Sequence, residues 1–122
     1  ITVKNSKVLI MGLTFKENIT DIRNSRVKDI YDELCLWGAC VYVADPHADR
    51  NQAKEEYGIE LVNIDFKQKY DAIVLAVKHN EYIKKPVEFY TKLIKRNGVF
   101  MDVKSVYKAC EFEKRGIKYC SL

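Results

Sequence analysis

Hydrophobic residues along the chain form short continuous runs that alternate with segments of helical periodicity. Three runs, at residues 7–13, 39–46 and 70–77, are rich in β-branched residues and end at polar residues or proline. Continuous apolar runs of this length are typical of strands that are buried on both faces, as in parallel sheets. We therefore predict strands at these positions and at 98–103, with shorter strands at 59–62 and 117–122.

Helices are predicted between these strands. A helix that begins near Asn24 or Ser25 and ends at Gly38 is indicated by apolar residues at three- and four-residue spacing: Val27, Ile30, Tyr31, Leu34 and Trp37. A short polar helix is expected at 48–57. A further helix is expected at 86–97, because Pro86 fits the first turn of a helix. Alternating strands and helices indicate an α/β fold, which we predict to be a Rossmann-like open parallel sheet of five to six strands with helices on both faces.

The size and charge of the chain fit one soluble domain. With 122 residues, 48% of them hydrophobic, the chain can bury about two thirds of its unfolded surface in one core. The net charge of +4 is mild and the basic residues form no stripe, so we expect no nucleic-acid partner. Because no apolar run approaches the roughly 20 residues of a membrane span and no signal peptide is present, we expect no membrane partner and a cytoplasmic location.

The cysteine and histidine residues give no metal-binding pattern. The four cysteines, Cys35, Cys40, Cys110 and Cys120, include no C-x-x-C pair, and the two histidines are isolated from them. We interpret all four cysteines as reduced structural thiols, and we expect Cys35 and Cys40 to pack as small hydrophobic residues. His47 and His79 are expected to be loop residues rather than catalysts, because the sequence places no nucleophile or carboxylate beside them.

The loop after the first predicted strand, at 12–25, carries four charged residues, Lys16, Glu17, Asp21 and Arg23. In open α/β sheets, ligands bind beyond the carboxyl ends of the strands, where this loop lies. The loop lacks the glycines of a dinucleotide fingerprint and of a Walker loop. Lys16 can instead neutralise a phosphate as a point charge, and Arg23 can add fork-like donors close to a helix start.

Other predicted strands bring polar residues to the same edge: Asp45 with His47, and Asp102 with Lys104. An alternative is that the loop charges only pair with one another and solvate a long connection. Exposed ion pairs contribute about 0 to 1 kcal/mol each, which accounts for solubility but not for the length of the loop. From the residues alone, we favour a core position for Phe15 over contact with a flat ligand.

Four segments together carry a resemblance to a known family: "GLTFKENITDIRNSRVKDI", "VYVADPHAD", "YDAIVLAVKHNEY" and "GVFMDVKSVY". In this order the chain resembles the C-terminal domain of the UDP-glucose/GDP-mannose dehydrogenases, and within them the branch that acts on UDP-N-acetylhexosamines. These NAD-dependent enzymes oxidise the 6-hydroxyl of a nucleotide sugar to a carboxylate. The resemblance implies that residues 1–122 form a single nucleotide-sugar-binding domain. The short lead at 1–6 has no initiating methionine, so we expect a piece of a longer polypeptide.

The resemblance also implies roles for individual residues. Phe15 and Lys16 match the pair that contacts the nucleotide sugar, and Lys104 matches a basic residue, often arginine, with the same role. Arg23 matches the arginine that reaches the NAD, which is bound mainly by an N-terminal domain that this chain lacks. The catalytic cysteine lies in a central region that is also absent, so no residue here is assigned as catalytic. We expect Asp21 to orient Arg23 or the loop backbone.

Implied partners are a UDP-sugar or related nucleotide sugar, the rest of the same polypeptide and, for the whole enzyme, a second copy in a homodimer. The isolated chain is expected to be inert. One alternative is an autonomous nucleotide- or protein-binding module without catalysis. A flavodoxin- or receiver-like signalling domain is disfavoured, because the first strand ends in Gly-Leu-Thr-Phe-Lys rather than an acidic cluster or flavin-cradling loop.

Overall fold

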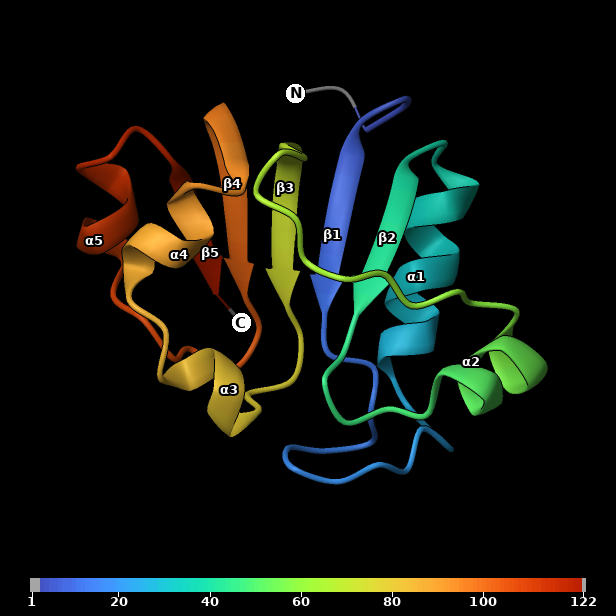
Figure 1. The fold of residues 1–122 in the computed structure, drawn as a ribbon. Coiled ribbons are helices and arrows are strands. Elements are labelled where there is room, and N and C mark those ends of the chain that lie inside the picture. Colours follow the sequence, from blue (N-terminus) through green and yellow to red (C-terminus); the bar gives the residue numbers. More distant parts are fainter. Residues whose placement is uncertain (1–2, 122) are drawn as a thin grey trace.

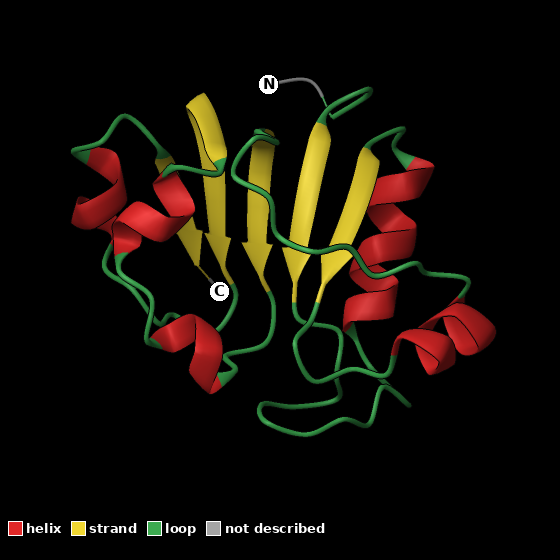
Figure 2. Ribbon diagram, viewed as in Figure 1, coloured by secondary structure: helices red, strands yellow, loops and turns green. Residues whose placement is uncertain are grey.

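The computed structural model describes residues 3–121, which form one sheet with helices on both sides (Figure 1). Five parallel strands pair in the order β2-β1-β3-β4-β5. Their arrows all point to the same edge of the sheet (Figure 2). The fold class predicted from the sequence is therefore confirmed, with five strands: β1 Lys7–Met11, β2 Cys40–Ala44, β3 Tyr70–Leu75, β4 Ile94–Asp102 and β5 Lys118–Ser121.

The helices divide between the two faces of the sheet, and alternate residues of β1 show the division. Val8 and Ile10 pack in a core with α1 and α2, whereas Leu9 and Met11 pack in a second core with α3, α4 and α5. A strand with both faces buried reads as a continuous apolar run, which explains the pattern at 7–13. The helices are α1 Val27–Leu36, α2 Arg50–Tyr57, α3 Asn80–Ile83, α4 Val87–Thr91 and α5 Ala109–Glu113.

The predicted strand at 59–62 is wrong. This segment makes a single bridge to the sheet, between Leu61 and Val43, and then crosses the face of the sheet to the start of β3 (Figure 1). Val62 and Ile64 pack against the core on that face. The apolar residues of this segment therefore pack on the face of the sheet and do not form a further strand of it.

The predicted helix at 86–97 is also too long, because α4 ends at Thr91 and β4 begins at Ile94. Apolar spacing continues through this join, so periodicity did not reveal it. Asn97 adopts a left-handed backbone with φ 65°, and the pairing register with β3 shifts at Tyr70/Ala72, which marks a bulge. Helices α3 and α5 were missed, since four or five residues are too few to show a helical stripe.

Exposure corrects two further expectations. Trp37, assigned to the apolar stripe of α1, is 61% exposed, and its indole N–H donates to Glu33 at 2.9 Å. All four cysteines are free thiols with exposed side chains, so the packing expected of Cys35 and Cys40 is wrong. Within residues 3–121, no helix has the length and apolar character needed to cross a membrane.

Candidate functional site

The carboxyl edge of the sheet contains the point where the strand order reverses. The chain passes from β1 to β2 on one side and continues to β3 on the other side of β1. Ligands of open α/β sheets bind in the crevice at such a point. The long loop at 12–26 and the turn that enters α3 both lie at this edge (Figure 1).

The first residues of the loop at 12–26 are held by close backbone packing and by a buried carboxylate. Gly12 has φ +107°, and a Cβ there would lie 2.6 Å from the Cβ of Val77, so only glycine fits. The N–H groups of Leu13 and Thr14 donate to Oδ2 of Asp45 at 2.6 and 3.1 Å. In dinucleotide-binding domains the N–H groups of this first loop bind the pyrophosphate. Since a carboxylate takes them here, this loop does not fit the pyrophosphate of NAD.

The tip of the loop extends from a buried base. Leu13 and Ile22 are fully buried, and the N–H of Phe15 donates to the carbonyl of Asp21 at 2.7 Å, which closes the tip. The ring of Phe15 is 57% exposed, so the core position favoured from the residues alone is wrong. An exposed aromatic ring at this edge is able to lie against a flat ligand.

Three lysines lie within electrostatic range of the carboxylate of Glu17. The pKa of Glu17 is lowered, first by its own backbone N–H and then by the positive charges of Lys78, Lys104 and Lys16. Lys16 and Lys104, which are 88 positions apart in the sequence, thus both act on Glu17 from loops at the carboxyl edge of the sheet. The loops that carry these two lysines follow β1 and β4, which are not neighbours, because β3 lies between them. Lys78 follows β3, so its loop lies between the loops of Lys16 and Lys104. The sequence did not indicate Lys78 as a site residue.

Arg23 lies beside a different set of charges. Its Nε and Nη2 donate to the two carboxylate oxygens of Asp21 at 3.1 and 3.2 Å, and its backbone N–H donates at 2.9 Å. These bonds lower the pKa of Asp21 and confirm that Asp21 orients Arg23. Both residues line an open hollow of about 750 Å³ near the start of α1, together with Asn24, Ser25, Lys28, Asp29, Glu56 and Tyr57.

The structure pairs Asp45 with His79, a contact that the sequence did not indicate. Both side chains are fully buried, and Nε2 of His79 lies 3.0 Å from Oδ2 of Asp45. Burial alone raises the pKa of Asp45, but hydrogen bonds from His79 and from the backbone N–H groups of Leu13 and His47 outweigh it and lower the pKa from 3.8 to about 2. Asp45 is therefore a charged anchor for the loops that follow β1, β2 and β3.

His47 also has a carboxylate neighbour. Its Nε2 lies 2.9 Å from Oε1 of Glu81, and its ring centroid lies 4.5 Å from that of His79. The fold thus gives each histidine a carboxylate partner that the sequence did not place beside it. Both His–carboxylate pairs join residues 34 positions apart, a separation that no local sequence pattern reports.

Asp102 organises the turn that carries Lys104. Oδ2 of Asp102 accepts from the N–H of Tyr107 and from the hydroxyl of Tyr119, both at 2.8 Å. Its Oδ1 is buried without a hydrogen-bond partner among the described residues. The carboxylate fixes the backbone after β4, and Lys104 extends from that turn into solvent. Nowhere in residues 3–121 do three or more His, Cys, Asp or Glu side chains form a group able to hold a metal ion.

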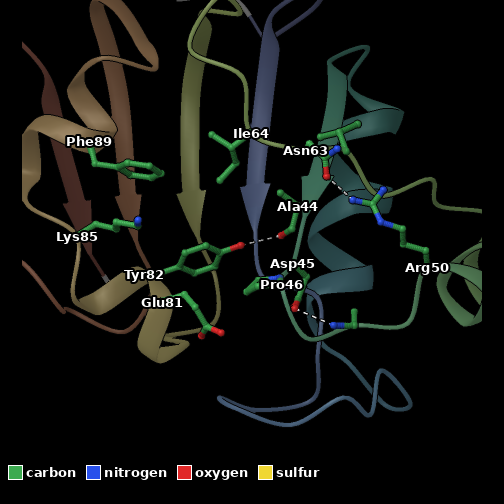
Figure 3. Close-up of a pocket in the computed structure, with 12 residues that line it drawn as sticks. Ala44, Asp45, Pro46, Arg50, Asn63, Ile64, Glu81, Tyr82, Lys85 and Phe89 are labelled. Carbon is green, nitrogen blue, oxygen red and sulfur yellow. Dashed lines mark hydrogen bonds between the residues drawn. The ribbon is translucent and has the colours of Figure 1, made fainter.

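A separate cavity of about 380 Å³ lies between the end of β2, the crossing segment and α3 (Figure 3). Tyr82 and Phe89 contribute aromatic walls, and Arg50 is held at its rim by the carbonyl of Leu61 and by Asn63. Asp45 is the one polar residue expected at the carboxyl edge that lines this cavity, whereas Phe15, Lys16, Arg23 and Lys104 do not line it.

Comparison with known proteins places the chain in a family. The profile of the UDP-glucose/GDP-mannose dehydrogenase family, UDP binding domain, matches residues 9–109. The chain is 43% identical over 104 residues to a UDP-N-acetyl-D-glucosamine 6-dehydrogenase of Pseudomonas aeruginosa, covering 85% of this chain and 25% of that protein. It is 35% identical over 111 residues to Protein CapL of Staphylococcus aureus, covering 91% and 26%.

Solved structures agree with this placement. An NDP-N-acetyl-D-galactosaminuronic acid dehydrogenase from Methanosarcina mazei Go1 superposes with a TM-score of 0.86 at 27% identity, covering 98% of this chain and 25% of that one. A UDP-glucose dehydrogenase from Pyrobaculum islandicum gives a TM-score of 0.71 at 26% identity, covering 96% and 25%. The chain spans about a quarter of the length of these relatives. The chain therefore belongs to the UDP-glucose/GDP-mannose dehydrogenase family and corresponds to its UDP binding domain.

Proposed function

We propose that the chain is the nucleotide-sugar-binding C-terminal domain of an NAD-dependent nucleotide-sugar 6-dehydrogenase. The whole enzyme would oxidise a UDP-hexose or UDP-N-acetylhexosamine to the uronic acid. The observation that carries the proposal is the position of three exposed lysines, Lys16, Lys78 and Lys104, on the loops that follow β1, β3 and β4 at the carboxyl edge of a UDP binding domain. The names of the Pseudomonas aeruginosa and Methanosarcina mazei relatives favour an N-acetylated sugar.

Charge and shape suggest how the substrate-binding residues act. A nucleotide diphosphate brings two negative charges, which Lys16 and Lys104 would neutralise from opposite sides of Lys78. Lys104 would act as a point charge, because an ammonium lacks the two-pronged fork of arginine. Phe15, adjacent to Lys16 and exposed, would lie against the nucleotide sugar.

The domain organisation in this proposal follows from the coverage of the relatives. Residues 1–122 would form a single domain, and the NAD-binding and central catalytic domains would belong to the remaining three quarters of the polypeptide. Arg23, which lies apart from the lysines, would contact NAD held by the N-terminal domain. The partners would be the rest of the polypeptide and, in the full enzyme, a second copy in a homodimer.

The test is UDP binding by the full-length enzyme and by its Lys16→Ala variant, measured by calorimetric titration. Loss of one charge-assisted contact to a phosphate is expected to weaken binding about 10- to 100-fold. Lys67→Ala is the matched control, because Lys67 is an exposed lysine just before β3, at the opposite edge of the sheet. Equal affinities for wild type and Lys16→Ala would contradict the proposal.

A further inference from the structure

His79 connects the substrate-binding loop to the sheet through both of its ring nitrogens. Nδ1 accepts the backbone N–H of Asn18 at 2.9 Å, so Nδ1 carries no proton. The proton of the neutral ring therefore lies on Nε2, which is 3.0 Å from Oδ2 of Asp45 and 3.2 Å from Oγ1 of Thr14. Thr14 in turn donates to the carbonyl of Lys16 at 2.7 Å. One imidazole thus contacts the loop on both sides of Lys16.

Asn18 completes this connection from the side of the loop. While its backbone N–H donates to His79, its side-chain Oδ1 accepts the N–H of Asn80 at 2.9 Å. Two hydrogen bonds of opposite direction therefore tie the loop tip to the turn that enters α3. His79 is fully buried, whereas Lys16 and Asn18 are exposed. The exposed tip of the loop is thus hydrogen-bonded to a buried histidine.

We propose that His79 is a positioning residue. In its neutral Nε2–H form, held by Asp45, it fixes the conformation of residues 14–18 and thereby sets where Phe15 and Lys16 meet the nucleotide diphosphate. The inference rests on the proposed function, because it assigns to His79 the support of that same binding site. A loop that is fixed before the ligand arrives binds more tightly, since no affinity is lost to loop conformations that cannot bind.

The same contacts exclude a direct part for His79 in the chemistry. Its side chain is fully buried, and both ring nitrogens have partners within the protein. A general acid or base must come within hydrogen-bond reach of the reacting group, whereas both ring nitrogens of His79 are engaged by groups of the protein. His79 therefore acts on the substrate only through the loop.

The test compares His79→Leu with His79→Asn in the full-length enzyme. Leucine fills the buried volume without a donor or an acceptor, whereas the Oδ1 of asparagine takes a position close to Nδ1 and can accept the N–H of Asn18. His79→Leu is expected to raise KM for the nucleotide sugar and Kd for UDP about 10- to 100-fold, with kcat changed less than about twofold. His79→Asn is expected to restore most of the affinity. Lys67→Ala, which changes an exposed lysine at the opposite edge of the sheet, serves as the control and is expected to leave the affinity within about twofold of wild type.

Each outcome decides the inference. If wild type binds UDP and His79→Leu binds it equally well, or no more weakly than His79→Asn, the positioning role is overturned while the proposed function stands. If wild type does not bind UDP, both are overturned. The ¹⁵N chemical shifts of the imidazole in the wild-type chain give a measurement that no variant can disturb by misfolding. They are expected to show a proton on Nε2 alone, and a proton on Nδ1 would overturn the inference.

Discussion

The buried carboxylate of Asp45 makes the free energy of unfolding depend on pH. The single substitution Asp45→Asn tests this contribution. Oδ2 accepts from Leu13 and Thr14 as well as His79, and Oδ1 accepts from the N–H groups of His47 and Ala48 at 2.7 and 3.0 Å. Asparagine has nearly the same shape but offers one acceptor oxygen instead of two, and its NH₂ group faces N–H donors. Asp45→Asn therefore resembles the protonated carboxyl of the wild type.

The magnitude follows from the pKa of Asp45. Folding lowers this pKa from 3.8 to about 2, and one pKa unit corresponds to about 1.4 kcal/mol. The ionised carboxylate thus contributes about 2.5 kcal/mol to the free energy of unfolding. Because the pKa is lower in the folded state, this contribution is fully present above about pH 4 and is lost as the pH falls through about pH 2.

The assay is urea unfolding followed by circular dichroism, since the single tryptophan, Trp37, is exposed and reports poorly on the core. At neutral pH, Asp45→Asn is expected to lower the free energy of unfolding by about 2 to 4 kcal/mol. Below about pH 4 the difference between the two proteins is expected to shrink. Asp49→Asn is the control, because asparagine caps a helix as well as aspartate does. A difference that stays constant from pH 7 to the acid limit would refute the reasoning.

Two further predictions concern the backbone and the activity. Gly12→Ala is expected to lower the free energy of unfolding by about 2 to 5 kcal/mol in the same urea assay, because alanine is strained at φ +107° and its Cβ overlaps Val77; a loss below about 1 kcal/mol would contradict this. The 122-residue chain alone is expected to give no NADH absorbance with NAD and any nucleotide sugar, because its first loop does not fit the NAD pyrophosphate; measurable turnover would overturn this.

Several features of the site were accessible from the sequence because they depend on local pattern. The apolar runs of β1, β2 and β3 and the polar loop at 12–25 predicted a parallel sheet with a binding loop at its carboxyl edge. The grouping of Asp21 with Arg23 was also foreseen, since the two residues are neighbours along the chain. Lys16 and Lys104 were identified by resemblance to family motifs rather than by any physical argument about their separation.

Other features of the site could be predicted only from the order of the strands in the sheet. Asp45 meets His79 only because β2 and β3 lie on either side of β1, so that their carboxyl ends open onto the same loop. Lys78 joins the lysine group because β3, not β1, neighbours β4. Strand order depends on how the crossover connections pack onto the sheet, and the contacts involved are far apart in sequence.

The sequence by itself determined the class of fold and the position of a charged loop at the carboxyl edge of the sheet, because hydrophobic period and loop composition act over a few residues. The tertiary structure alone decided the exposure of Phe15, the placement of Lys78 between the loops of Lys16 and Lys104, and the burial of His79 against Asp45. These depend on which strands lie side by side. For Asp45 and His79 the energy comes from burial and from charge in a low-dielectric interior, which exists only once the chain has folded.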